Sequence, residues 1–158
     1  MKLFGLALGL LSLLPVAAAA ECVSVSAGDL TISKPWSRVT IGTERPAVFY
    51  VVIQNNGDTD DRLTGIETPI AAMPMLHQTV VTDGVASMPH AEVIDIPAGE
   101  TVALAPGGYH GMLMDLTEAL VDGQTFPVTL TFEKAGEVTV DTQILPMRAK
   151  EAQCDAAS

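Results

Sequence analysis

Short runs rich in β-branched and aromatic residues recur along the chain at intervals of about ten residues, and turn-forming residues end each run. The clearest run is Val48-Phe49-Tyr50-Val51-Val52-Ile53, and Asn55-Asn56-Gly57-Asp58 follows it with turn chemistry. The same reasoning predicts strands at residues 29–36, 46–54, 61–66, 75–82, 85–88, 92–96, 101–104, 109–116, 126–132 and 138–144. Only residues 117–121 suggest a helical turn. The pattern predicts an all-β fold, either an antiparallel sandwich or a barrel.

The start of the chain has the pattern of an export signal. Lys2 supplies a positive charge, Leu3 to Val16 is an apolar run too short for a membrane span, and Ala18-Ala19-Ala20 offers small residues for cleavage. We therefore expect a signal peptide at residues 1–20 and a single domain at residues 21–158, located in the periplasm without stable membrane insertion. An uncleaved anchor is the alternative.

The two cysteines, Cys22 and Cys154, lie near the two ends of the expected domain. An oxidising compartment favours a disulfide between them, which would tether the polar residues 151–158. Two free thiols or an intermolecular bridge are the alternatives. Lipid attachment at Cys22 is disfavoured, because Glu21 stands where a lipoprotein signal has a small residue.

Charge and side-chain patterns exclude two classes of function. The formal net charge is −11 at pH 7, and this acidity argues against a nucleic-acid partner, whose phosphates would be repelled. The chain has no local Ser/His/Asp or paired-carboxylate arrangement. We therefore do not expect an enzyme.

Candidate metal ligands are concentrated in one part of the chain. All three histidines and five of the seven methionines lie between residues 73 and 114. Copper(I) is a soft ion, for which imidazole nitrogen and thioether sulfur are suitable donors. Neither donor is a thiolate that an oxidising compartment could destroy. Zinc would be expected to use Cys, His or carboxylate, and calcium or magnesium would need oxygen ligands, so the cluster favours copper(I).

His110-Gly111-Met112 lies in a predicted strand, where residues two apart point to the same face. His110 and Met112 would therefore present nitrogen and sulfur side by side, with Gly111 leaving the opposite face unobstructed. Met114 shares their parity and is expected to belong to the core.

Similar reasoning applies to the other members of the cluster. Met73 and Met75 share the parity of His77, with Pro74 interrupting the strand, and both are expected to pack around the site. His90 is expected to be an exposed loop residue and not a Cu(I) ligand. It is a candidate for a secondary Cu(II) site, since Cu(II) prefers nitrogen and oxygen donors.

Four of the candidate ligands have the spacing H-x10-M-x21-H-x-M. They are His77, Met88, His110 and Met112. This spacing matches the signature of the periplasmic PCu(A)C copper chaperones, which the chain resembles over roughly residues 28–145. Other segments that add to the resemblance are Pro35-Trp36-Ser37-Arg38, Ala47-Val48-Phe49-Tyr50, Pro106-Gly107-Gly108-Tyr109-His110 and Phe132-Glu133-Lys134-Ala135-Gly136. Gln78 departs from the family, which often has Met beside the first His.

The resemblance implies a cupredoxin-like antiparallel β-sandwich with Greek-key connections. It also implies that the four residues bind one Cu(I) at one surface of the sandwich. The protein would then deliver this ion for assembly of the copper centre of cytochrome c oxidase. The implied partners are the copper-bearing oxidase subunit, a Sco-type thiol protein, or both.

Other functions stay open at this point. The copper could be stored or sequestered instead of delivered. A cupredoxin-type electron carrier is less favoured, because it would need a cysteine with two histidines around one copper. A metal-free scaffold would leave the His/Met spacing as a coincidence. The residues by themselves indicate a thiol-free His/Met copper site in an exported β domain.

Overall fold

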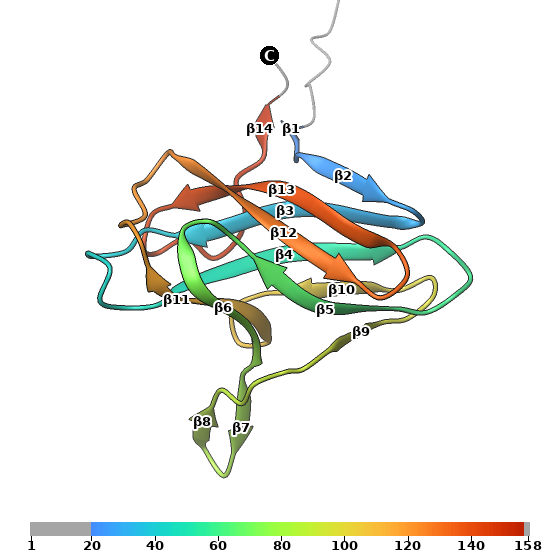
Figure 1. Ribbon diagram of the computed structural model, residues 1–158, viewed down its shortest axis with the longest axis horizontal. Coiled ribbons are helices and arrows are strands. Elements are labelled where there is room, and N and C mark those ends of the chain that lie inside the picture. Colours follow the sequence, from blue (N-terminus) through green and yellow to red (C-terminus); the bar gives the residue numbers. More distant parts are fainter. Residues whose placement is uncertain (1–19, 157–158) are drawn as a thin grey trace, which may run out of the picture.

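The computed structural model describes residues 20–156, and every regular element in this range is a β-strand (Figure 1). In chain order the strands are β1 (Ala20–Glu21), β2 (Ser24–Ala27), β3 (Leu30–Arg38), β4 (Ala47–Asn55), β5 (Asp61–Glu67), β6 (Ala71–Gln78), β7 (Val80–Thr82), β8 (Val85–Ser87), β9 (Ile94–Ile96), β10 (Thr101–Leu104), β11 (Tyr109–Leu116), β12 (Thr125–Phe132), β13 (Gly136–Leu145) and β14 (Asp155–Ala156). The predicted all-β class is confirmed. The predicted signal peptide falls, apart from Ala20, outside the described residues. Within the described part, no helix could cross a lipid bilayer.

Ten strands form one curled sheet in the order β6-β11-β10-β4-β3-β13-β12-β5-β9, with β2 added beside β3. Most neighbours are antiparallel, as predicted. The exceptions are β3 with β13 and a single rung between β10 and β11. The parallel pairing of β3 and β13 is accessible because a long stretch of chain connects them. The curl brings β5 against β6 and β11, so that two layers of strands enclose the core.

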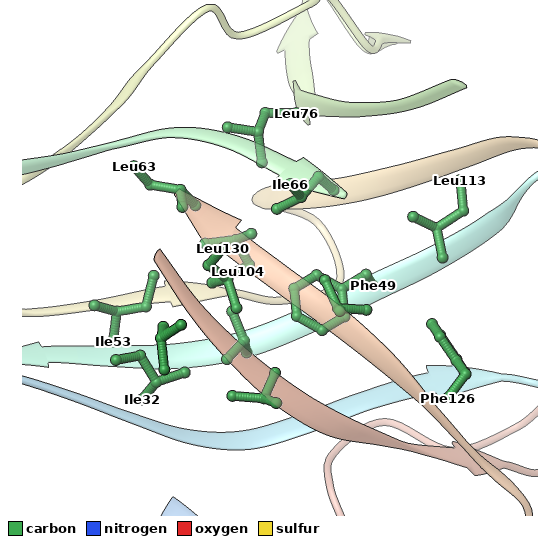
Figure 2. Packing of buried hydrophobic residues seen from close by; sticks show 14 of the residues in the cluster. Ile32, Phe49, Ile53, Leu63, Ile66, Leu76, Leu104, Leu113, Phe126 and Leu130 are labelled. Carbon is green, nitrogen blue, oxygen red and sulfur yellow. The ribbon is translucent and has the colours of Figure 1, made fainter. Parts of the chain in front are cut away.

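The core lies between these layers and is built by alternating side chains. Every second residue of β12 and β13 is buried along most of each strand, as in strands with one covered face. Phe49 of β4, Ile66 of β5 and Leu113 of β11 belong to this core (Figure 2). Packing of these side chains therefore determines which face of β4 and β11 points inward.

Strands β10 and β11 act as one interrupted strand along β4. β10 pairs with residues 51–54 of β4, and β11 pairs with residues 47–49. The interruption is closed by hydrogen bonds from the Gly108 N–H to the Ala105 carbonyl (3.0 Å) and from the Ala105 N–H to the Tyr109 carbonyl (2.8 Å). This closed loop directly precedes His110 and positions the start of β11.

A second, smaller cluster covers the opposite face of β3 and β4. Trp36, Tyr50 and Leu145 are buried there beneath the segment that follows β13. The Arg38 guanidinium lies 5.4 Å from the Trp36 ring centroid and 5.7 Å from that of Tyr50. Burial raises the pKa of Tyr50, and the positive charge of Arg38 opposes this shift.

The ends of the described chain are joined covalently. Cys22 and Cys154, 132 residues apart in sequence, form a disulfide with Cα atoms 4.4 Å apart. This confirms the predicted pairing. β1 and β14 pair beside it, at the end of the molecule away from the β7–β8 hairpin (Figure 1).

Two sequence predictions differ from the structure near residue 77. Pro74 does not interrupt the strand, because β6 begins at Ala71 and continues through it. β6 is the last strand of the sheet, where a proline that lacks an N–H can be accommodated. The strand predicted at residues 75–82 is divided at Thr79, whose N–H donates to the Gly108 carbonyl (3.0 Å). Beyond this point the chain leaves the sheet and forms the β7–β8 hairpin.

The helical turn predicted at residues 117–121 is absent. Leu120 is buried, its N–H donates to the Thr40 hydroxyl (3.0 Å), and its carbonyl accepts from the Thr40 N–H (3.1 Å). These two bonds hold the segment against the β3–β4 loop and leave no helical backbone pairing at Leu120.

Candidate metal centre

His77 and His110 face each other across the antiparallel pair β6–β11. Their ring centroids lie 6.0 Å apart, with the ring planes inclined at 45°. Because a metal–imidazole nitrogen bond is about 2.0 Å long, the two rings are close enough to share one ion. The structure thus brings together two candidate ligands that are far apart in sequence.

The ring of His110 is held in one orientation by the loop that precedes β11. Its side chain is buried, with 4% of its surface exposed. The Nδ1–H donates to the carbonyl oxygen of Gly108 (3.1 Å), in the loop between β10 and β11. Because a carbonyl can only accept, Nδ1 carries the proton and Nε2 keeps its lone pair in the neutral ring. A backbone acceptor on the other ring nitrogen is typical of metal-binding histidines.

His77 is held in the same way by a different segment. Its Nδ1–H donates to the carbonyl oxygen of Met88 (3.1 Å). The opposite nitrogen, Nε2, is buried and has no hydrogen-bond partner among the described residues. A buried acceptor without a partner is costly unless something binds it. The lone pair of His77 Nε2 is therefore free to bind a metal ion in the candidate site.

The two methionines of the candidate set differ in exposure. Met112 lies two residues beyond His110 on the same face of β11 and is partly buried between β6 and β4. Met88 follows β8, and 52% of its side chain surface is exposed. Its backbone contact with His77 places it beside the histidine pair. The four residues therefore come from three segments that meet at one edge of the sandwich.

His90 lies as near to His77 as His110 does. His77 and His90 form an isolated β-bridge, and their ring centroids are 5.9 Å apart. Distance alone therefore does not separate His90 from the candidate ligands. Burial separates His90 from His110, which is enclosed, but not from Met88, which is exposed like His90. The exclusion of His90 from the Cu(I) ligands stays a prediction.

Gly111 has a different role from the one expected. The face opposite His110 and Met112 is filled, because a Cβ at Gly111 would meet Ile66 Cδ1 at 2.7 Å and Phe49 Cβ at 3.0 Å. A glycine is needed there so that β11 can lie close against the core. The close packing keeps His110 and Met112 on the outer face.

Of the methionines assigned to packing, Met114 lies elsewhere than expected. Met114 was predicted to belong to the core, but it is only partly buried and is not a member of either buried cluster. Met73, opposite it on β6, has 46% of its surface exposed. Both lie on the outer face because they share the parity of the two histidines. A sequence signal for this exists, since Met-x-Met-x-His in β6 is the reverse of His-x-Met-x-Met in β11.

The available donors suit a soft metal ion. Imidazole nitrogen and thioether sulfur are both neutral, and both bind copper(I) well. No group of three or more His, Cys, Asp or Glu side chains that could hold a metal occurs within residues 20–156. The nitrogen and sulfur donors of the four candidate ligands differ from the oxygen ligands that calcium and magnesium prefer.

A family profile and a curated relative both match most of this chain. A family profile described as "Putative lipoprotein LpqE-like" matches residues 30–144. The chain is 37% identical to "Putative lipoprotein Lxx21020" of Leifsonia xyli subsp. xyli over 116 residues, which is 73% of this chain and 69% of that protein.

Solved structures of the same fold include proteins of known metal content. The copper-bound PCuAC domain from PmoF2 is 30% identical, with a TM-score of 0.68 over 78% of this chain and 98% of that domain. The solution structure of CuI-DR1885 from Deinococcus radiodurans is 28% identical, with a TM-score of 0.57 over 82% of this chain and 83% of that one. The chain therefore belongs to the LpqE-like family and has the PCuAC fold.

Proposed function

We propose that this protein is an exported copper(I) chaperone. It binds one Cu(I) as cargo through His77, Met88, His110 and Met112, and delivers it for assembly of the copper centre of cytochrome c oxidase. The observation that supports this most strongly is the histidine pair, with rings 6.0 Å apart and the buried Nε2 of His77 without a partner among the described residues. The protein acts as a carrier and not as an enzyme.

The ligand set suits transfer as well as binding. All four donors are neutral, so no thiolate or carboxylate holds the ion. Met88 is half exposed at the base of the β7–β8 hairpin, where an incoming ligand can replace it first. A reduced dithiol in the recipient offers stronger donors for a soft ion. Copper therefore moves from this protein toward thiolate sites.

The relatives support copper as the cargo. One similar structure is of a copper-bound domain, and another is of a Cu(I) form. The recipient follows from the resemblance to PCu(A)C chaperones: the copper-bearing oxidase subunit, a Sco-type thiol protein, or both. A secondary Cu(II) site at the exposed His90 belongs to the same proposal.

The disulfide supports a periplasmic location and bears on two alternatives. Disulfides persist in oxidising compartments such as the periplasm. Since the sulfur of Cys22 is bonded to Cys154, it is not available for lipid attachment, although the relative's name describes a lipoprotein. Both cysteines of the chain are in this bond, so neither supplies the thiolate that a blue-copper electron carrier needs.

Competition for Cu(I) under anaerobic conditions tests the ligand assignment. Alanine substitution of each of the four ligands should weaken the first bound equivalent by more than about tenfold, or about 1.4 kcal/mol. Met147→Ala is the matched control, because Met147 is 51% exposed and Met88 is 52% exposed. Parental affinity in all four ligand variants would refute the assignment.

Delivery is tested separately from binding. Copper-loaded protein is mixed with a reduced dithiol acceptor, the two are separated, and the metal is measured on each. Transfer should require reduced thiols, because a disulfide offers no thiolate. Copper that stays on this protein with every competent acceptor would indicate storage instead. In cells, deletion should lower cytochrome c oxidase activity most at low copper.

A further inference from the structure

The outer face of β6 and β11 carries more sulfur than the four-residue site uses. Below the pair of His77 and His110, the antiparallel register aligns Met75 with Met112 and Met73 with Met114. The three pairs form consecutive rungs on one face, first imidazole, then thioether, then thioether. We call Met73, Met75, Met112 and Met114 the methionine ladder.

The methionine ladder is not part of the hydrophobic core. None of its members belongs to either buried cluster or to the partly buried residues packed against them. On the same strands, the core positions are held by Leu76, 3% exposed, and Leu113, 0% exposed. Met73, in contrast, is 46% exposed. Core packing therefore does not account for the thioethers on this face.

The ladder is also accessible from solvent. Met114 lines an open cleft of about 430 Å³, together with residues 43–46 of the β3–β4 loop, Asp115 and Leu116. An ion entering this cleft reaches the outermost thioether rung without passing the histidine pair. The route to the ladder is thus separate from the hairpin that carries Met88.

The spacing of the ladder allows its sulfurs to share an ion. Directly opposite residues of an antiparallel pair have Cβ atoms about 4.5–5.5 Å apart. Successive rungs on one face are about 7 Å apart, since a strand rises about 3.4 Å per residue. Flexible methionine side chains span these distances. Three thioether sulfurs suit a soft monovalent ion better than a hard cation, which prefers oxygen ligands.

We propose that Met73, Met75 and Met114 form a second Cu(I) site, weaker than the first and next to it. The proposal rests on copper being the cargo of the protein. Met75 adjoins the first site because it lies opposite Met112. The second site is the weaker one because all its donors are thioethers, whereas the first site also contains two imidazoles.

Anaerobic titration with Cu(I), in competition with chelators of graded affinity, tests this second site. The parent protein should bind two equivalents, the second at least about tenfold more weakly than the first. The double variant Met73→Leu/Met114→Leu should bind one equivalent with unchanged affinity, because leucine conserves volume and packing but lacks sulfur. Met147→Leu, a similarly exposed methionine outside the ladder, should retain both equivalents.

Methyl NMR of the unaltered protein gives a second readout that needs no variant. Silver(I), a diamagnetic soft monovalent ion, is added beyond one equivalent. The second equivalent should shift the methyl signals of Met73, Met75 and Met114 and leave Met147 unchanged. A second equivalent retained by the double leucine variant, or no movement of the Met73 and Met114 signals, would overturn the proposal.

The two copper proposals fail in different ways. His77→Ala should weaken the first, tight equivalent by more than about tenfold and leave the affinity of the second unchanged. If His77→Ala kept the tight equivalent while the double leucine variant lost the weak one, the four-residue site would be wrong and the ladder right. If the ladder variant behaved as the parent and His77→Ala lost tight binding, the reverse would hold.

Discussion

The two faces of the β6–β11 pair have opposite chemistry although alternate residues of the same two strands form them. The inward face presents Leu76, Gly111 and Leu113, all buried. The outward face presents histidines and methionines in matching cross-strand pairs. The inward face has no polar side chain at these positions, and the outward histidine and methionine pairs contribute nothing to the buried clusters.

This contrast shows how a fold without local ligand motifs can assemble a metal site. In a strand, a slip of one residue exchanges the two faces. The buried leucines therefore fix the register that sets His77 opposite His110. Stability comes from one face and chemistry from the other, and the two can be perturbed separately.

The largest predicted difference is between truncations on opposite faces. Leu113→Ala should lower the free energy of unfolding by about 2–5 kcal/mol, because it leaves a cavity at a fully buried position. Met73→Ala, on the outer face, should change it by less than about 0.5 kcal/mol. Urea denaturation of the copper-free protein measures both. Equal losses in the two variants would mean that the outer face also belongs to the core.

Removal of the disulfide should come next in size. Cys22→Ser/Cys154→Ser should lower the free energy of unfolding by about 2–4 kcal/mol, because the bond closes a loop with a sequence separation of 132. Cu(I) affinity should be retained, since the two cysteines adjoin β1 and β14, which lie at the end of the molecule away from the β7–β8 hairpin (Figure 1). A comparable loss of copper affinity would show that the two ends are coupled.

A substitution at Gly111 should cause a smaller loss of stability and also weaken copper binding on the other face. Gly111→Ala should cost about 1–3 kcal/mol, because the added Cβ collides with Ile66 and Phe49. The displaced strand also carries His110, so Cu(I) binding should weaken. Gly65→Ala is the control, because a Cβ there meets no atom within 4 Å. Parental stability and affinity in Gly111→Ala would show that β11 can shift without cost.

The smallest predicted effect concerns alkaline pH. Burial raises the pKa of Tyr50 above its ordinary value of 10.0. As the pH rises through 10, the unfolded chain loses this proton before the folded one does, so stability should decline. Tyr50→Phe should show less decline between pH 9 and 11 in urea titrations. An identical decline in the variant would assign the effect to other groups.

The sequence carries more information about strands than about their partners. The predicted strands at residues 101–104 and 109–116 agree with β10 and β11, because alternation and turn residues are local signals. The position of Pro74 inside β6 could not be read locally, since it depends on β6 being at the edge of the sheet.

The candidate site was predictable in composition and only partly in geometry. The spacing of the four ligands can be read directly from the sequence. The alignment of His77 with His110 depends on core packing between distant strands. The mirrored Met-x-Met-x-His and His-x-Met-x-Met segments contained the ladder, yet the usual role of methionine as core filler led to the wrong assignment of Met114.

X-ray absorption at the copper K-edge, on protein loaded anaerobically with one equivalent of Cu(I), tests the central claim most directly. The edge should be that of Cu(I), and the first shell should contain two nitrogen and two sulfur scatterers, with the outer-shell scattering of two imidazole rings. This is the shell expected from His77, His110, Met88 and Met112. A shell without sulfur, or with no imidazole scattering, would contradict the proposal that the outer faces of β6 and β11, together with Met88, form the copper site.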